Sequence, residues 1–519
     1  MTTPTLRIAR RRLAVLAAAA FAVVPVAGCG SSGSSAGGAD DPAKAIPASA
    51  PVYLEATIRP TGKQRTDLEA SGRKVLGTSD PAAKIRELID KAGSKEGKSF
   101  DKDIKPWLGS KAAIAVTSVA AGQPQFAVVV DSTDDAKARK LIEDDSSYKT
   151  KRSFEGTDYR FDPEDGTAAG VIDNYLVVAS EPSFKQVATL LDKGGNSLAD
   201  NKDLQTARAK VGGRPGFAFV DLQGLVRTVA SDGAANLGPT ELAALNSIFK
   251  SFRAFGIGAS ADAQAVRLSL ASLGSGSGTG RGPGAALPLE QAPGTAWLAF
   301  SQKDLGKTIS GVLTSLENAN SGSAGGTISD TITQLETATG LKVKEDLLSW
   351  MGDAGLFVEG DSLPALGGAL VVQSTDPAKT RAAILKIKGL LRQFNQPVGA
   401  TPPGTSPGFT LKVGTRVAPL QIGLAGSKFV IALGKTALRD AIRPKSTLGS
   451  KAAFKSASGL LGATAKPSFY VDFRTVTRFI GLIGGSSPSF QRAKPYLDAF
   501  TAAIGGGANG KTEIAIGLK

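Results

Sequence analysis

The chain has 519 residues, which is longer than one ordinary hydrophobic core and predicts two or more domains. Its 42% apolar and 21% charged residues indicate a globular protein rather than a disordered one. It contains no histidine and one cysteine, Cys29. This composition excludes an intrachain disulfide, a zinc site made of cysteine and histidine, and Ser-His-Asp or Cys-His catalysis. An enzyme built from this chain would have to use carboxylates, lysine, tyrosine or an oxygen-bound metal.

The formal net charge is +15, but the first 28 residues hold four arginines and no acid. Without that segment the chain carries 57 basic and 46 acidic residues, a net charge of +11. The basic residues are scattered among acids, whereas nucleic-acid-binding surfaces usually show a basic stripe with aromatic residues in it. We therefore expect no nucleic-acid partner and a mildly basic surface that tolerates anionic lipid or wall polymer.

The first 28 residues have the pattern of a signal peptide. Arginines occur between residues 7 and 12, and residues 13–28 (LAVLAAAAFAVVPVAG) are apolar and uncharged. This run has 16 residues, fewer than the roughly 20 that a spanning helix needs. Length and flanks together predict a cleaved export signal at 1–28, with the general and twin-arginine export routes both open.

The end of this segment, Val26-Ala27-Gly28-Cys29, resembles the lipobox of bacterial lipoproteins. The resemblance implies that the Cys29 sulfur receives a diacylglyceryl group and that the leader is cut before Cys29. Two or more acyl chains give stable anchoring. Residues 29–45 then read as a flexible Gly/Ser tether. We therefore expect the chain on the extracytoplasmic face of the cell membrane, with the membrane as a partner through the acyl chains on Cys29.

After the tether, short strand and helix patterns alternate. Asp80-Pro81 is a helix-start signal before Ile85, and Thr133 and Thr375 each precede another amphipathic pattern. Apolar or alternating runs bounded by turn residues predict strands at 112–119, 125–131, 175–180, 215–221, 266–272 and 512–519. Most successive strands are separated by a turn or by one helix, which predicts an α+β fold with a largely antiparallel sheet packed with helices.

A second Gly-rich linker, at 274–287, divides the rest into units 46–273 and 288–519. The two units repeat four segments in the same order, which predicts two homologous domains from an internal duplication. The matched pairs are FDKDIKPWLGSKAAIAV from Phe100 with VKEDLLSWMGDAGLFV from Val343, VVVDSTDDAKARKLI from Val128 with LVVQSTDPAKTRAAI from Leu370, YLVVASEPSFKQVATLL from Tyr175 with KFVIALGKTALRDAI from Lys428, and FAFVDLQGLVRTV from Phe217 with SFYVDFRTVTRFI from Ser468.

Residues 505–512 (GGGANGKT) satisfy the phosphate-loop pattern GxxxxGK[ST]. That loop functions only between a strand and a helix, because amides at the helix start hold the phosphates. Here the residues that follow alternate like a strand, so we predict a hairpin turn and no nucleotide site.

Other possible sites read as local structure. The acids at 131, 134, 135 and 143–145 lack the spacing of a calcium loop and fit helix ends. Asp162, Glu164 and Asp165 lie in a turn sequence, DPEDG. Ser-x-x-Lys at 71–74 and 146–149 lacks the companion motifs of penicillin-recognising enzymes. We therefore expect no catalytic residue, no metal and no cofactor.

Four residues at matched places in the two units suggest structural roles. Trp107 and Trp350 each precede an apolar residue and a glycine, and we predict that both pack in a core. Asp221 and Asp472 each end a strand before a helix and are predicted N-caps.

The lipobox, the tether, the opening IPASAPVY from Ile46 and the doubled WLG/WMG and FVD/YVD segments resemble a family of uncharacterised actinobacterial lipoproteins that carry a domain of unknown function. The resemblance covers nearly the whole mature chain and implies no established activity.

Three hypotheses follow. The first is a non-enzymatic envelope protein that binds or scaffolds another envelope protein or wall polymer. The second is a carrier of lipid or another apolar ligand between a curved sheet and helices. The third is a carboxylate-dependent wall hydrolase or transferase, for which acids present in only one unit, such as Asp162, Glu164 and Asp165, would be the candidates.

Overall fold

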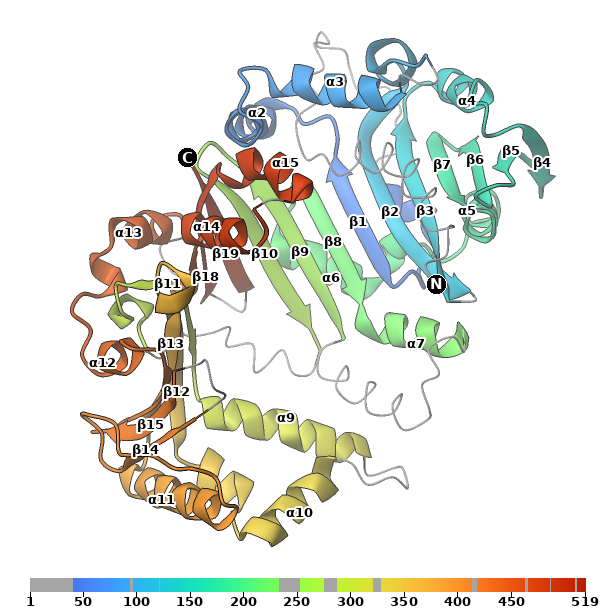
Figure 1. The fold of residues 1–519 in the computed structure, drawn as a ribbon. Helices are drawn as coiled ribbons and strands as arrows, with labels where there is room; N and C mark the ends of the chain where they lie inside the picture. The colour runs from blue at the N-terminus through green and yellow to red at the C-terminus, as the bar shows by residue number, and fades with distance from the viewer. Residues whose placement is uncertain are drawn as a thin grey trace. The chain divides into compact units, whose positions relative to one another are not determined.

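The computed structural model describes residues 41–93, 97–120, 122–232, 253–274, 287–320, 328–412, 418–462, 465–485, 487–508 and 511–519 (Figure 1). The chain divides into two compact units, Met1–Gly238 with Phe249–Ser277, and Pro239–Ile248 with Gly278–Lys519. Each unit combines helices with an antiparallel sheet, which confirms the predicted α+β class. In the described ranges no helix is both long and apolar enough to cross a bilayer.

The predictions for the start of the chain fall on residues that the structure does not describe. The leader 1–28, its lipobox residues Val26, Ala27 and Gly28, and Cys29 itself lie outside the described residues, as does most of the linker 274–287.

The sheet of the first unit has the strand order β4-β5-β6-β7-β3-β2-β1-β8-β9-β10 among the described residues, and every neighbouring pair is antiparallel. The elements of this unit are η1 (Pro42–Ala45), β1 (Val52–Thr57), α2 (Gly62–Leu76), α3 (Pro81–Gly93), η3 (Phe100–Ile104), β2 (Leu108–Ala120), β3 (Gln123–Ser132), α4 (Asp135–Glu143), β4 (Thr150–Phe154), β5 (Thr157–Asp162), β6 (Thr167–Ile172), β7 (Tyr175–Ser180), α5 (Glu181–Lys193), η4 (Leu198–Asp200), α6 (Lys202–Val211), β8 (Gly216–Asp221), α7 (Leu222–Asp232), β9 (Ala254–Ala261) and β10 (Ala265–Leu273).

Both faces of this sheet carry a core. On one face η1, α5, η4 and α6 bury their apolar side chains against the strands, with Tyr53 and Phe219 at the centre. On the other face α3, α4 and η3 cover β2, β3, β6 and β7 around Trp107. Because successive side chains of a strand point to opposite faces of the sheet, alternate residues of the same strands supply the two cores.

The sheet of the second unit has the order β14-β15-β16-β13-β12-β11-β17-β18-β19, again with antiparallel neighbours. Its elements are η6 (Leu289–Gln291), β11 (Ala296–Gln302), α9 (Leu305–Asn320), α10 (Ile328–Thr339), η7 (Val343–Leu348), β12 (Met351–Glu359), η8 (Leu363–Ala365), β13 (Gly367–Ser374), α11 (Pro377–Gln393), β14 (Gly408–Leu411), β15 (Leu420–Ala425), β16 (Lys428–Leu433), α12 (Ala437–Ile442), η9 (Leu448–Ser450), α13 (Ala452–Ser458), β17 (Lys466–Asp472), α14 (Phe473–Gly484), α15 (Pro488–Leu497), β18 (Phe500–Ala508) and β19 (Lys511–Leu518).

The two sheets have the same order when their strands are matched by position. β1 corresponds to β11, β2 to β12, β3 to β13, β7 to β16, and β8, β9 and β10 to β17, β18 and β19. At the remaining edge β6 and β5 correspond to β15 and β14, and the first unit adds β4. The sequence did not predict β4 to β6, because the polar sequence TKRSF and the small residues TAAG have weak strand signals.

A tryptophan follows a π-helical turn in both units. Trp107 follows η3, and its Nε1 donates a hydrogen bond to the carbonyl oxygen of Asp103 at 2.7 Å. Trp350 follows η7 and donates in the same way to Asp346 at 2.8 Å. Both rings are only 1% exposed, which confirms the predicted core role.

The helix start predicted at Asp80 is found in the structure, but in α4 and α11 the N-cap is one residue later than predicted. The N-caps of α4 and α11 are Asp134 and Asp376, whose side chains accept hydrogen bonds from backbone amides three residues on. Thr133 and Thr375, which the sequence placed at these starts, instead donate from their amides to the carbonyl oxygens of the two tryptophans. The acid directly after each threonine is in the better position to cap.

The boundary of the tether also differs. The sequence assigned Asp41–Ala45 to the flexible segment 29–45, but Pro42, Ala43 and Ala45 are buried in η1 of the first unit. Asp41 caps this turn by accepting a hydrogen bond from the Ala43 amide at 3.0 Å. The sequence GGADD is polar and rich in glycine throughout, so it gives no signal that the fold begins at Asp41.

Candidate functional site

The phosphate-loop pattern at 505–512 lies on a hairpin, as predicted. Its first four residues belong to β18 and Lys511 begins β19, with Ala508 and Lys511 paired across the two antiparallel strands. No helix follows Thr512, which lies in β19. The amides of this segment belong to a sheet, so the structure offers no helix start for a phosphate.

The acidic positions singled out in the sequence are engaged in local structure. Asp131 is 2% exposed, and its Oδ2 accepts hydrogen bonds from the amide and hydroxyl of Ser110 at 2.8 and 3.2 Å. Asp162 accepts hydrogen bonds that close the turn before Gly166. Asp221 and Asp472 cap α7 and α14, as predicted. In the described part of the chain no three acidic, histidine or cysteine side chains lie close enough together to hold a metal ion.

The Ser-x-x-Lys pair that lies in a helix is not arranged for catalysis. Ser71 is 5% exposed inside α2 and donates its hydroxyl to the carbonyl oxygen of Leu68 at 2.9 Å, while Lys74 is exposed. A serine nucleophile needs its hydroxyl directed at a base.

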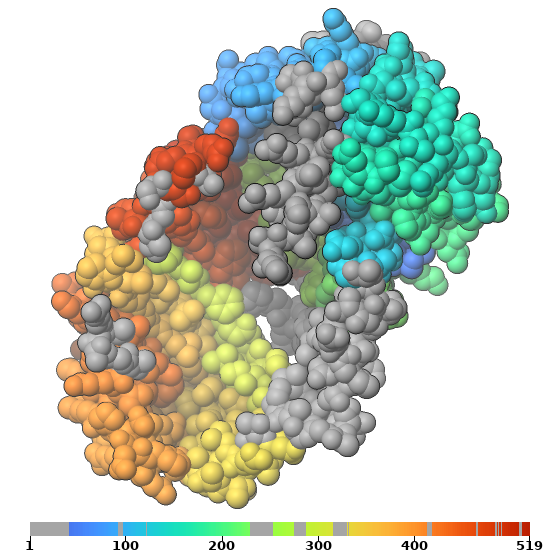
Figure 2. Space-filling view, turned by 45° about the vertical axis from the view of Figure 1, so that its right-hand side comes forward, coloured from blue at the N-terminus to red at the C-terminus, as the bar shows by residue number. Residues whose placement is uncertain are grey.

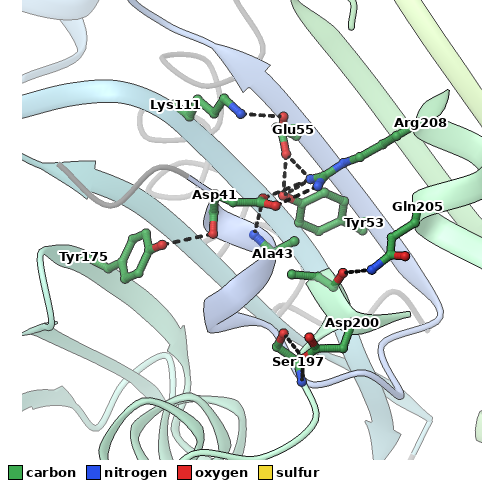
Figure 3. Close-up of polar contacts among 11 residues, drawn as sticks. Asp41, Ala43, Tyr53, Glu55, Lys111, Tyr175, Ser197, Asp200, Gln205 and Arg208 are labelled. Atoms are coloured by element: carbon green, nitrogen blue, oxygen red, sulfur yellow. Dashed lines mark hydrogen bonds and ion pairs between the residues drawn. The ribbon is translucent and has the colours of Figure 1, made fainter. Parts of the chain in front are cut away.

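A charged cluster that the sequence did not indicate lies between η1, β1, β2 and α6 of the first unit (Figure 3). At its centre Arg208 of α6 binds Asp41 through both terminal nitrogens, at 2.7 and 3.0 Å. The same guanidinium donates to Glu55 Oε2 at 2.5 Å. Lys111 Nζ lies 3.5 Å from the other oxygen of Glu55. We call these residues, with Tyr53, the Arg208 cluster.

Two tyrosines complete the hydrogen bonding of this cluster. The hydroxyl of Tyr53 donates to Glu55 Oε2 at 2.8 Å, and that of Tyr175 donates to the backbone carbonyl of Asp41 at 2.9 Å (Figure 3). The guanidinium carbon of Arg208 lies 5.8 Å from the ring centre of Tyr53 and 5.4 Å from that of Phe217. Aromatic faces at this distance stabilise a cation.

Burial and pairing set the protonation of the cluster. Burial alone would raise the pKa of Asp41, but the hydrogen bonds and charge of Arg208 outweigh it and lower the pKa below its ordinary value. Burial, reinforced by the charge of Glu55, raises the pKa of Tyr53 well above 10.0. Tyr53 therefore remains a neutral donor, and Asp41 remains an ion.

The cluster contains two cations and two carboxylates, so its formal charge is zero. Both oxygens of Asp41 and Glu55 contact a donor or a cation. A general acid or base needs an oxygen directed at a substrate, and these carboxylates have none to spare. The arrangement instead fastens the start of the folded chain to the sheet and to α6.

The second unit has no such cluster at the equivalent place. Glu55 lies two residues after Tyr53 in β1, and Ser301 lies two residues after Ala299, the counterpart of Tyr53 in β11. Arg208 follows a buried alanine in α6, and Ser458 follows one in α13. The hydroxyl oxygens of Ser301 and Ser458 are buried without a hydrogen-bond partner. The ion pairs of the Arg208 cluster therefore have no counterpart at these two positions of the second unit.

The second unit has its own buried acid at another position. Glu359, at the end of β12, is 2% exposed and accepts hydrogen bonds from the hydroxyls of Thr295 and Thr436, both at 2.5 Å. The corresponding position in β2 is Thr117, whose hydroxyl lies 2.7 Å from that of Ser183. Each unit thus has a charged side chain at a position where the other has a neutral hydroxyl.

Two hollows of the first unit differ in chemistry. One, of about 140 Å³, lies over β1, β2, β8 and β9 and is lined mainly by small and aliphatic residues, among them Leu54, Ile114 and Ile257. The other, of about 590 Å³, lies along α3 and is lined mainly by charged side chains, among them Arg86 and Asp90.

Comparison with known proteins identifies the family of this chain but assigns it no function. Residues 13–506 match the family described as "Protein of unknown function (DUF3352)", so the chain belongs to that family. The protein is thus an α+β member of a family without an assigned activity. No curated protein matches the sequence.

Among the solved structures that show weak likeness to this chain are three crystal forms of one protein, TP0453. Its crystal form III gives a TM-score of 0.25 at 11% identity over 46% of this chain and 81% of that chain. Crystal form IV gives 0.25 at 12% identity, over 45% and 81% of the two chains. Crystal form I gives 0.20 at 9% identity, over 78% and 96%. At these TM-scores the likeness supports no conclusion about this chain.

Proposed function

We propose that this protein is an extracytoplasmic lipoprotein of the cell envelope, anchored by acyl chains on Cys29, that binds or scaffolds another envelope component and catalyses no reaction. The observation that carries the proposal is the attachment of Asp41. This residue lies twelve positions after Cys29 and is held by Arg208 and Tyr175. Twelve extended residues reach about 40 Å at most.

A short tether fastened in this way would keep the first unit within that distance of the bilayer. A pull on the tether would act on Asp41, where two charge-assisted hydrogen bonds to one guanidinium and a turn of η1 resist it. A protein that only diffused would not need an ordered junction at this point.

The two hollows described in the first unit are poorly suited to an apolar ligand, which favours binding at a surface over transport. Sites for small molecules commonly enclose about 300–1,000 Å³ and are mostly apolar. The apolar hollow over β1 and β8 has about 140 Å³, which is too small for an acyl chain. The larger one is lined by charges, which an apolar ligand would have to desolvate.

Metabolic labelling with an alkynyl palmitate analogue tests the anchor. The unaltered protein should take up the label and partition with membranes, whereas Cys29→Ser should remain unlabelled with its leader uncleaved. An unlabelled wild-type protein would refute the proposal. Cross-linking of the labelled protein in intact cells should then yield a defined partner, and the absence of any partner would count against a binding role.

We also propose that the two units descend from one domain by internal duplication. The shared strand order, the equivalent tryptophan hydrogen bonds and the matched aspartate N-caps support this origin. In other members of the family the two halves should align with each other over the same four segments. Halves that align no better than shuffled sequences would contradict the duplication.

A further inference from the structure

One surface of the second unit combines exposed apolar side chains with arginines that form no ion pair among the described residues. It consists of α14 and α15, which follow β17 and precede β18. Among the large apolar side chains that the structure leaves exposed are Leu482 at 57% and Tyr496 at 42%. In Figure 2 the red C-terminal segment that contains these helices reaches the molecular surface.

The two helices are fixed to the sheet and to each other. Phe479 is 8% exposed, and its ring centre lies 5.4 Å from that of Trp297 in β11. Between the helices, a Cβ on Gly481 would lie 3.5 Å from Cε1 of Phe490, so the backbone of α14 approaches α15 closely. The exposed side chains therefore lie on two helices that are packed against the sheet and against each other.

Arginines lie beside the exposed apolar residues. Arg474, Arg478 and Leu482 follow one another at four-residue spacing and share one face of α14, and all three are exposed. Arg492 and Tyr496 repeat this spacing on α15. An aliphatic or aromatic side chain next to arginine is the pattern of helices that lie in a membrane interface.

Acids do not neutralise this surface. Residues 473–497 contain four basic residues and no acid. The flanking acids are occupied, because Asp472 caps α14 and Asp498 pairs with Lys494 at 2.5 Å. Within the described residues no ion pair is formed by the three arginines of this surface.

In the described part of the first unit, the counterpart of α14 is α7, and its charges differ. α7 has one arginine, Arg227, which pairs with Asp221 at 3.3 Å, and the helix ends in Asp232. Among the described residues, α14 thus differs from its counterpart α7 in carrying two arginines that form no ion pair.

We propose that α14 and α15 form a second membrane contact, which binds the surface of an anionic phospholipid bilayer through Arg474, Arg478, Arg492, Leu482 and Tyr496. The charge complementarity argues for anionic lipid, and the exposed apolar side chains would enter the boundary between headgroups and acyl chains. This inference rests on the proposed location at the membrane. Together with the anchor on Cys29 the contact would hold the protein to the bilayer at two points.

The test uses the full mature chain with Cys29→Ser, so that no acyl chain contributes, and vesicles of phosphatidylcholine with and without phosphatidylglycerol. Sedimentation should show binding only to vesicles that contain phosphatidylglycerol, and salt should weaken it. Because each cation near an anionic surface contributes about fivefold to affinity, Arg474→Gln, Arg478→Gln and Arg492→Gln together should reduce binding at least tenfold.

Two controls distinguish binding through this surface from binding that depends only on the total charge or the total exposed apolar area of the protein. Lys303→Gln, Lys435→Gln and Lys455→Gln remove the same charge from exposed positions of the same unit and should change binding by less than about threefold. Leu482→Ser should weaken binding, whereas Leu385→Ser, at a side chain that is 53% exposed on α11, should not. Circular dichroism would verify that each variant folds.

Equal losses in the arginine and lysine triples, or no binding of the parent chain to anionic vesicles, would overturn the proposal. Neither result would affect the labelling of Cys29. Failure of the second contact is therefore distinguishable from failure of the anchor.

Discussion

The two units share their strand order and their tryptophan turns but differ in buried charge. The first unit holds Asp41, Glu55 and Arg208 together, and the second has unpartnered serine hydroxyls at the places of Glu55 and Arg208. Buried ion pairs are costly to desolvate and are seldom the cheapest way to fill a core. Since Asp41 stands at the start of the folded part of the chain, we infer that the cluster has a local task, which is to fix the start of the fold.

The largest effect is expected from the positions that the units share. Trp107→Ala and Trp350→Ala should each cost about 3–5 kcal/mol, because each removes a fully buried ring and leaves its partner carbonyl without a donor. Hydrogen exchange measured by mass spectrometry should show loss of protection mainly in the mutated unit. If either substitution were nearly neutral, the two turns would not be equivalent.

The Arg208 cluster should give the next largest effect. Arg208→Met leaves Asp41 and Glu55 close together without their shared cation, and we expect a loss of about 2–3 kcal/mol, less than for a fully buried pair because Arg208 is 27% exposed. Chemical denaturation would measure it. Adding Asp41→Asn and Glu55→Gln should restore part of the loss.

The matched control in the second unit is Ser458→Ala. Because its hydroxyl has no partner, this change should stabilise the protein slightly or leave it unaltered. A loss as large as that of Arg208→Met would contradict the contrast between the units.

Acid should affect the first unit before the second. Burial would raise the pKa of Glu181, but hydrogen bonds from Tyr159, Arg152 and Lys185 outweigh it and lower the pKa to about 2. The pKa of Asp41 is also lowered. A carboxylate whose pKa is lower in the folded than in the unfolded state stabilises the fold when the pH is above its unfolded pKa, which is near 4. This stabilisation should therefore be lost as the pH falls from about 4 towards 2.

Limited digestion with pepsin across that range measures the order of loss. Cleavage should begin in the first unit, and Glu181→Gln should make its onset less dependent on pH. Earlier cleavage in the second unit would contradict the assignment.

The smallest effect is expected at the hairpin that imitates a phosphate loop. Lys511→Ala should alter the free energy of unfolding by at most about 0.5 kcal/mol, as is usual for surface positions. Mg-ATP should not shift the melting temperature of either form. A stabilising shift that Lys511→Ala removes would show that this turn binds phosphate after all.

Sequence reasoning succeeded where the signal is local. The strands at 125–131 and 175–180, the caps Asp221 and Asp472, and the hairpin after Ala508 all depend on periodicity or turn chemistry within a few residues. The buried state of Trp107 and Trp350 could be read from their equivalent places in the two units.

The Arg208 cluster could not be predicted in this way. Asp41 and Arg208 are 167 residues apart in the sequence, and Asp41 lies at the end of a Gly/Ser-rich stretch that predicts a linker. A signal was nevertheless available, because aligning the units sets the charged Glu55 and Arg208 against Ser301 and Ser458. A charged residue in one unit that aligns with a neutral residue in the other indicates an interaction that is specific to the first of them.

The most direct test of the account is the intact mass of the protein purified from membranes, together with its N-terminal peptide. We predict a polypeptide that begins at Cys29 and carries a diacylglyceryl group on the sulfur. A chain that begins elsewhere, or a Cys29 with a free thiol, would contradict the anchor on which the proposed function depends.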